Sequence, residues 1–282
     1  MIERLRDDTL NLMKIPGLSG HEDKVRDYIK EAVKKIGLTP TFDKLGNLTI
    51  TFPGTSPRVM LFTHMDQLGL VVRKIEDDGY LRFERVGGVP EKILLGQNIS
   101  VIAKNGKELS GIIGTKSHHA TQPDEKYKVP SYRDLYIDLG LRTASEVRTN
   151  GIDIGSPIVY KPSAEVIGDE KIIGTSVDDR AGCAVLLEVA RQINSRAAGP
   201  EINIVFTVQE EFNLRGALPV AQKIKPEIAI QIDLLLASDT PDMRDFGEIK
   251  LGEGPGISMF SFHGRGTLNG VIPHPVLVKH FE

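Results

Sequence analysis

Histidine, aspartate and glutamate side chains follow four separate strand-like runs of this sequence. They are His64 and Asp66, Asp178 and Asp179, Glu210 and Glu211, and Asp233. Imidazole and carboxylate groups are the ligands that Zn²⁺, Co²⁺ and Mn²⁺ prefer at hydrolytic sites. One carboxylate shared by two such ions holds them about 3.5–4 Å apart, a geometry that suits amide hydrolysis. The residue types therefore indicate a site for divalent metal ions.

Each of these residues also has a purely structural interpretation. Asp178 and Asp179 stand just before a helix-like run, where a carboxylate accepts hydrogen bonds from free backbone N–H groups. His64 alone reads as a hydrogen-bonded core histidine, and Glu210-Glu211 alone as a solvated helix start. A shared site is favoured because ligands gather at the carboxyl ends of the strands in an open α/β sheet.

The elements that must position these residues alternate between strand and helix patterns. Short apolar runs, typical of buried strands, cover residues 59–62, 171–174, 202–208 and 227–232. Apolar residues at helical spacing predict helices over 3–14, 22–36, 179–193 and 216–223, and a last one over 275–282. This alternation predicts an α/β fold.

Between residues 70 and 162 the pattern changes to short alternating runs separated by turn glycines. Strands are expected over 99–103, 109–113 and 135–138. A short helix is expected to begin at Thr143, which forms a capping box with Glu146. We therefore expect a small β-rich domain, residues 70–162, inserted into an α/β domain made of residues 1–69 and 163–282.

The composition excludes several classes of protein. The 282 residues are 40% hydrophobic and 26% charged with a formal net charge of −3, so no basic surplus favours nucleic acid. The single cysteine, Cys183, excludes a disulfide within the chain and is predicted to be a small core residue. Neither an apolar signal core nor a run of membrane-spanning length is present, so we expect no membrane partner and a cytoplasmic location.

Four motifs carry a resemblance to a known family. They are His64-Met65-Asp66-Gln67-Leu68-Gly69, Asp178-Asp179-Arg180-Ala181-Gly182, Gln209-Glu210-Glu211 with Arg215-Gly216-Ala217, and Asp239-Thr240-Pro241. In order and spacing the chain resembles the TET-type dinuclear metallo-aminopeptidases, which are glutamyl and deblocking aminopeptidases sometimes labelled endoglucanase or cellulase. The resemblance implies a three-layer α/β/α metallopeptidase domain with an inserted small β-barrel, or PDZ-like, domain.

The resemblance also implies a metal-ligand set with two divalent ions, Zn, Co or Mn. His64 would bind the first ion, Asp178 would bridge both, and Asp233 would complete the ligands of the first. Glu211 would bind the second ion. Family members carry a further C-terminal histidine for that ion, but this sequence ends at Glu282, so we expect the second site to be incomplete.

Two catalytic roles follow from the same resemblance. Glu210 would be the general base that takes a proton from water and passes it to the leaving amine. Asp66 would orient the imidazole of His64, as a carboxylate partner of a metal-bound histidine does. Asp179 is expected to cap the following helix and shape the turn, with an unusual peptide bond after Asp178.

Two functions therefore remain open. The first is a metal-dependent aminopeptidase that removes N-terminal residues from peptides by metal-activated water. The second is a catalytically impaired or inactive member that serves as a scaffold or assembly subunit. In either case the resemblance implies a homo-oligomer, with dimers building a larger, often dodecameric, particle through the inserted domain. Glycoside hydrolysis is disfavoured because it needs two carboxylates across a sugar cleft rather than a metal site.

Overall fold

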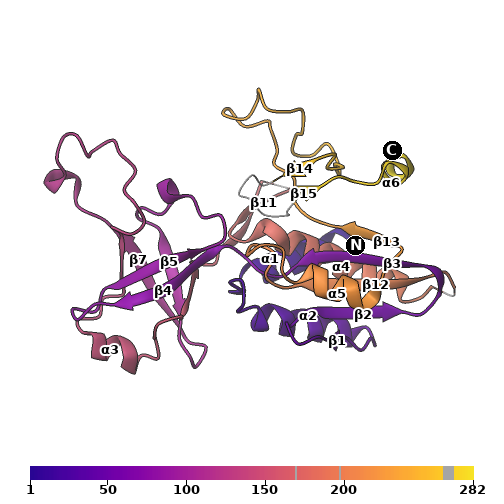
Figure 1. The fold of residues 1–282 in the computed structure, drawn as a ribbon, viewed down its shortest axis with the longest axis horizontal. Coiled ribbons are helices and arrows are strands. Elements are labelled where there is room, and N and C mark those ends of the chain that lie inside the picture. The colour runs from indigo at the N-terminus through magenta and orange to yellow at the C-terminus, as the bar shows by residue number, and fades with distance from the viewer. Residues whose placement is uncertain (169, 197, 263–269) are drawn as a thin grey trace. The chain divides into compact units, whose positions relative to one another are not determined.

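Figure 1 shows the computed structural model of the chain, which describes residues 1–168, 170–196, 198–262 and 270–282. The contacts divide the chain into two units, residues 1–232 and residues 233–282. The first unit contains a central sheet with its helices and a closed β-barrel. The closed barrel confirms the β-rich character predicted for the segment after residue 70.

In the central sheet, one long strand has a parallel neighbour on each side. In order, its strands are β1 (Thr41–Phe42), β2 (Leu48–Phe52), β12 (Pro200–Thr207), β3 (Thr55–His64) and β13 (Ile228–Gln231). β3 runs parallel to both β12 and β13, and β2 runs antiparallel to β12. The carboxyl ends of β3, β12 and β13 therefore meet at one edge of the sheet, as the sequence predicted.

Helices cover both faces of this sheet and make three layers. α1 (Ile2–Met13), α2 (Asp23–Lys35) and α4 (Val177–Ile193) lie on one face, and α5 (Ala217–Ile224) lies on the other. Successive side chains of a strand point to opposite faces, so Leu61 of β3 joins the core beneath α4. Its neighbour Met60 packs against Val220 of α5. The expected three-layer α/β/α arrangement is thus confirmed.

The second sheet of the first unit closes into a six-stranded barrel. Around the barrel the strands are β4 (Gly69–Ile75), β5 (Leu81–Val86), β8 (Tyr136–Asp138), β7 (Glu108–Gly114), β6 (Asn98–Ile102) and β9 (Pro157–Tyr160). Phe83 and Val101 are buried inside it. The short helix α3 (Ala144–Thr149) begins as predicted, with the Glu146 N–H donating to the Thr143 hydroxyl over 3.1 Å.

One predicted strand lies outside the central sheet. Residues 171–174 form β11 (Lys171–Gly174), but it pairs with β10 (Ala164–Ile167) in a two-stranded antiparallel sheet. The expectation that a strand of the main sheet delivers Asp178 was therefore wrong. A short apolar run defines a strand without defining its partner, and here the nearest partner in sequence pairs with it. The remaining short elements of this unit are the 3-10 turns η1 (Glu91–Ile93) and η2 (His118–Ala120).

The second unit, residues 233–282, contains little regular structure. Its described elements are the antiparallel pair β14 (Ser261–Phe262) and β15 (Gly270–Val271), and the predicted helix α6 (Pro275–Phe281). Ser238 ties the unit together locally, because its N–H and hydroxyl both donate to the carbonyl of Ile249. No helix in the described part of the chain combines the length and apolar character needed to cross a bilayer.

A buried carboxylate joins α1 to α4 within the first unit. Glu188 is 5% exposed and accepts hydrogen bonds from Arg4 over 2.7 Å and from Arg191 over 3.3 Å. The hydrogen bond from Arg4, with those from Gln192 and Arg191, holds the pKa of Glu188 at about 2, below its usual value of 4.5. The ionised form is therefore the one that stabilises the folded chain.

The variant Glu188→Gln should lower the free energy of unfolding by about 1–2 kcal/mol at pH 7, because it removes charge-assisted hydrogen bonds. A carboxylate whose pKa is lowered by folding stabilises the folded state at pH values above its unfolded-state pKa, which is about 4.5 for glutamate. That stabilisation is lost as the pH falls from there toward the folded-state value of about 2. Urea unfolding of both proteins across this range should show the difference shrinking. Glu31→Gln, which removes an exposed pair with Lys34, is the control and should change stability little.

Candidate active site

The imidazole of His64 lies at the carboxyl end of β3 and is 2% exposed. Its Nε2 atom is 3.0 Å from Asp178 Oδ1 and 3.9 Å from Glu210 Oε2. Its Nδ1 atom is 3.1 Å from the carbonyl oxygen of Asp66 and 3.4 Å from Asp66 Oδ1. Burial disfavours a charged imidazole, but the hydrogen bonds with Asp178 and Asp66 outweigh burial and raise the pKa of His64 well above 6.5.

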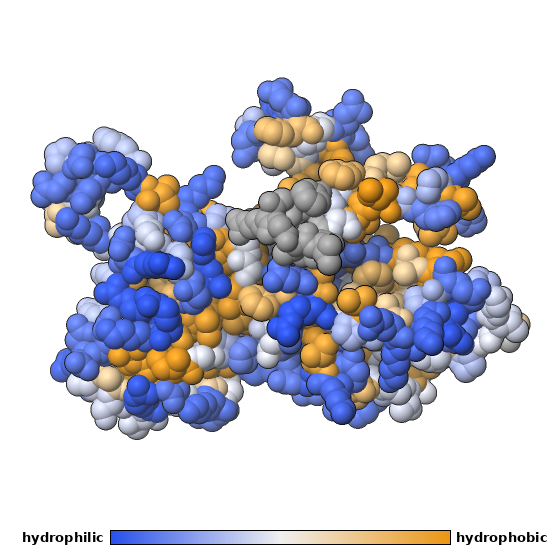
Figure 2. Space-filling view, in the orientation of Figure 1, coloured by the Kyte–Doolittle hydropathy of each residue, from blue (hydrophilic) through white to orange (hydrophobic). Residues whose placement is uncertain are grey.

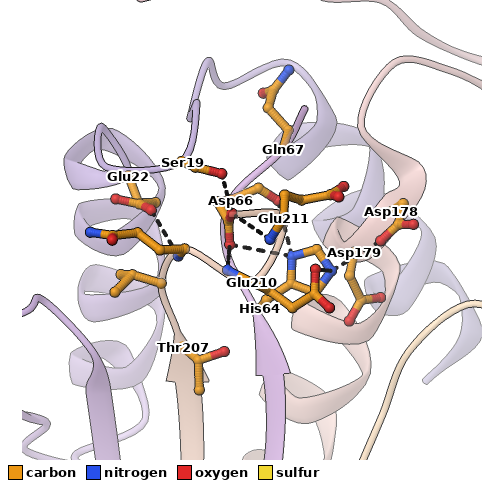
Figure 3. A network of polar contacts seen from close by, with 12 residues as sticks. Ser19, Glu22, His64, Asp66, Gln67, Asp178, Asp179, Thr207, Glu210 and Glu211 are labelled. Atoms are coloured by element: carbon orange, nitrogen blue, oxygen red, sulfur yellow. Dashed lines mark hydrogen bonds and ion pairs between the residues drawn. The ribbon is translucent and has the colours of Figure 1, made fainter. Parts of the chain in front are cut away.

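Asp178 reaches this imidazole from the start of α4. Both Asp178 and Asp179 have non-helical backbone angles, and the peptide bond between them is cis, the unusual bond that the sequence analysis expected. The fully buried Asp179 caps the helix, because its carboxylate accepts the Gly182 N–H over 3.0 Å and the Thr63 hydroxyl. The Asp178 side chain is 56% exposed, so one of its faces is open to a ligand. Figure 3 shows Asp178 and Glu210 on the same side of the imidazole.

Asp66 is fully buried and holds the turn that carries both glutamates. Its Oδ1 accepts the N–H of Glu210 over 2.9 Å, and its Oδ2 accepts the N–H of Glu211 over 3.1 Å. The hydroxyl of Ser19 also donates to Oδ2. Burial favours the neutral acid, but the hydrogen bond and charge of His64, followed by the hydrogen bonds from Ser19 and from the Glu210 N–H, lower the pKa of Asp66. Sequence reasoning assigned Asp66 to the imidazole and missed its two bonds to this turn.

The two glutamates stand in different surroundings. Burial, and then the negative charge of Asp178, raise the pKa of Glu211 to about 8. A cation bound nearby reverses this effect, since a divalent ion is the largest local charge in such a site. The Glu210 side chain is 24% exposed and lies beside the imidazole of His64. Consecutive residues therefore present two half-buried carboxylates beside His64 and Asp178.

Asp233 follows the last strand of the central sheet. The N–H of Ile232 donates to the carbonyl of Phe62 over 2.8 Å, which continues the pairing of β13 with β3 up to the residue before Asp233. One ligand atom each from His64, Asp178 and Asp233 lie within 4.8 Å of one another. Zinc with bonds of about 2.0–2.2 Å holds its tetrahedral ligands roughly 3.3–3.6 Å apart. One imidazole and two carboxylates at this spacing therefore fit a divalent metal after small side-chain adjustments.

A buried arginine, to which the sequence analysis gave no role, supports the backbone near this group. Arg180 is fully buried, and its Nη1 donates to the carbonyls of Leu12 and Ile15 over 3.1 and 3.2 Å. Its Nη2 donates to Gln67 Oε1 over 3.3 Å. Burial lowers the pKa of Arg180 to about 10. Arg180 thus links the connection between α1 and α2 to the segment that follows His64. In the sequence, only its position directly after Asp178-Asp179 pointed to Arg180.

A further prediction from the sequence concerns Cys183, which contacts the backbone of His64. Cys183 is fully buried in α4, as predicted for a core residue, and its thiol donates to the carbonyl of His64 over 3.2 Å. Burial raises its pKa to about 12, which does not suit a nucleophile. The structure thus brings His64, Asp178 and Asp233 together, with Asp66 and the two glutamates beside them.

A three-layer α/β/α domain with an imidazole and carboxylates at the carboxyl edge of its sheet has donor groups that suit a divalent metal at a hydrolytic site. The family model described as M42 glutamyl aminopeptidase matches residues 46–282. The chain belongs to this family, and it is accordingly a hydrolase of the aminopeptidase class. The match confirms the resemblance inferred from the four motifs.

Individual relatives agree with this assignment. The Escherichia coli (strain K12) protein SgcX is 36% identical over 281 residues, which are 99% of this chain and 75% of that protein. The lysyl aminopeptidase of Pyrococcus furiosus is 33% identical over 86% of this chain and 70% of its own length. The structure of the Pyrococcus horikoshii TET1 peptidase, which can assemble into a tetrahedron or a large octahedral shell, matches with a TM-score of 0.79 and 30% identity. That match covers 89% of this chain and 73% of the peptidase.

Proposed function

We propose that this protein is a metal-dependent aminopeptidase that removes N-terminal residues from peptides. The observation that carries the proposal is the group formed by His64, Asp178 and Asp233, with the Glu210 carboxylate 3.9 Å from the same imidazole. Imidazole and carboxylate ligands suit Zn²⁺, Co²⁺ or Mn²⁺. The fold and the family membership support peptide hydrolysis at this position.

His64, Asp178 and Asp233 would hold one ion, and Asp178 with Glu211 would hold a second one. A divalent metal bound there supplies Lewis-acid polarisation of the scissile carbonyl and lowers the pKa of water. The Glu210 carboxylate accepts the proton of the attacking water and transfers it to the leaving amine, which makes it the general base and then the general acid. Asp66 holds the Glu210 backbone in place while this proton moves.

We also propose that the protein works as a homo-oligomer in the cytoplasm, with the barrel of residues 70–162 as its assembly domain. Several large apolar side chains are exposed on the barrel and on the β10–β11 hairpin. They are Ile93, Leu95, Ile112, Val166, Ile167 and Ile173. Figure 2 shows orange areas on one face of the barrel. Contact between copies would remove this surface from water, and the TET1 peptidase provides a precedent for assembly.

Metal content and peptidase activity, measured together, test the proposed function. We expect the purified chain to hold one or two divalent ions and to release product from a panel of aminoacyl-p-nitroanilides. A chelator should abolish release, and Zn²⁺, Co²⁺ or Mn²⁺ should restore it. N-acetylated versions of the same substrates separate two kinds of enzyme, since an aminopeptidase that requires a free α-amine leaves them uncleaved and a deblocking aminopeptidase cleaves them. Absence of both bound metal and release would instead favour the inactive scaffold.

A further inference from the structure

The turn that carries Glu210 and Glu211 is held by carboxylates at three consecutive backbone positions. The N–H of Gln209 donates to Glu22 Oε1 over 3.1 Å, and the next two N–H groups donate to the two oxygens of Asp66. Gln209 has φ of +54°, a left-handed conformation that non-glycine residues adopt infrequently. The position of both glutamates therefore depends on these side chains, which Figure 3 shows converging on the turn.

Glu22 is placed to hold this turn rather than its own helix. It occupies the N-cap position of α2, yet its side chain makes no capping hydrogen bond to α2. Instead, Oε1 accepts the N–H of Gly20 over 2.7 Å as well as that of Gln209. The residue is only 4% exposed. A buried carboxylate is costly unless hydrogen bonds compensate for the lost water, so its placement here requires these contacts.

Ser19 acts on the same turn through Asp66. Its hydroxyl donates to Asp66 Oδ2, the oxygen that also accepts the Glu211 N–H. The backbone around Ser19 is fixed against the segment after β3, because Gln67 N–H donates to the Gly17 carbonyl over 3.0 Å. The Gln67 side chain also accepts a hydrogen bond from the Gly17 N–H over 3.1 Å. The connection between α1 and α2 is therefore hydrogen-bonded in both directions to the segment that follows β3.

We propose that Glu22 and Ser19 are positioning residues for catalysis, which fix the turn of residues 209–211 so that Glu210 is aligned for proton transfer. The inference rests on the proposed aminopeptidase function, since alignment matters only if Glu210 transfers a proton. Neither side chain contacts the group of candidate metal ligands directly in the bonds described here; each works through a backbone N–H or through Asp66. Displacement of a catalytic group by about 1 Å is enough to cost about 10²-fold in rate.

The test compares Glu22→Ala with the conservative variant Glu22→Gln. Glu22→Ala removes the acceptor, so kcat should fall by about 10- to 100-fold while KM changes by less than about threefold, as expected for lost transition-state stabilisation. Glu22→Gln keeps an acceptor oxygen and should recover most of the lost kcat. Ser19→Ala should give a smaller fall in kcat than Glu22→Ala, because Asp66 keeps its other donors.

Glu188→Ala is the matched control, since it removes another buried carboxylate that lies on α4 and contacts Arg4 and Arg191. It should lower the melting temperature and leave kcat unchanged when assayed well below that temperature. A second readout is independent of activity. Amide hydrogen exchange of metal-free protein should show residues 209–211 protected in the wild type and exchanging faster in Glu22→Ala, with no such change in Glu188→Ala.

Three results would overturn the positioning role. The first is a wild-type kcat in Glu22→Ala, and the second is a fall in kcat that Glu188→Ala reproduces equally. Unprotected amides at 209–211 in the wild type would also overturn it, because the hydrogen bonds would then be absent in solution. A wild-type protein that binds metal but cleaves no substrate would contradict the proposed function instead. The exchange data would then still decide whether Glu22 holds the turn.

Discussion

Replacing Glu210 with glutamine should lower kcat by about 10²–10⁴-fold, the usual contribution of a general acid–base group. Glutamine has nearly the same shape but neither accepts nor returns a proton at neutral pH. The backbone N–H of residue 210 would still donate to Asp66 Oδ1, so the turn should keep its geometry. Steady-state kinetics on the best aminoacyl-p-nitroanilide, with metal content measured on the same sample, checks this expectation.

The informative result is a large loss of kcat without a loss of bound metal. KM should stay near the wild-type value, because Glu210 is proposed to act on the attacking water and the leaving amine rather than to bind the peptide. Arg215→Ala changes an exposed residue near the same turn and serves as a control. A Glu210→Gln enzyme that keeps more than about a tenth of the wild-type kcat would contradict the general-base role.

Replacing Asp178 with alanine should remove most of the bound metal and lower kcat/KM by at least about 10²-fold. Mutation of a residue that only hydrogen-bonds to a metal ligand already lowers metal affinity or activity by about 10–100-fold. Asp178 is the residue proposed to be shared by both ions, so its loss affects both sites. Its side chain is 56% exposed and bonds to His64 Nε2 over 3.0 Å, so the fold should tolerate the change. Metal analysis after dialysis and a thermal melt of the metal-free proteins measure the two effects separately.

The control for this variant is Asp27→Ala, which removes an exposed carboxylate on α2 that pairs with Lys30 over 3.3 Å. It should leave metal content, activity and stability close to those of the wild type. Full metal content in Asp178→Ala would show that Asp178 is not a ligand. A melting temperature that collapses together with the metal content would point to a structural role instead.

Much of the fold was predictable because its signals are local. The spacing of Val25, Ile29 and Val33 predicted α2, and all three residues are buried in the core beneath it. The apolar run ending at Phe62 predicted β3 and placed His64 at its end. Thr143 and Glu146 predicted the start of α3. In each case the pattern of one short segment decides the structure of that segment. The exact domain boundaries stay a prediction.

The rest of the site depends on contacts that no local pattern contains. Glu22 and Gln209 are 187 residues apart, and their hydrogen bond exists only because the α1–α2 connection folds against the end of β12. The left-handed backbone conformation of Gln209 could not be predicted from the sequence, because glutamine rarely adopts it. The sequence analysis correctly placed Asp178 at the carboxyl edge of the central sheet, but the reason given was wrong. The start of α4 positions Asp178, not a strand of that sheet.

The short covalent path between the two sheets of the first unit has a mechanical consequence. His64 is the last residue of β3, and Gly69 is the first residue of β4 in the barrel. The segment is closely packed at Gly69, where an added methyl group would collide with the Ile158 carbonyl and with Leu18. A movement of the barrel caused by a neighbouring molecule would have only the four residues between His64 and Gly69 in which to be absorbed before it reached the histidine. In any assembly built through the barrel, quaternary structure and turnover rate would be linked by the backbone itself.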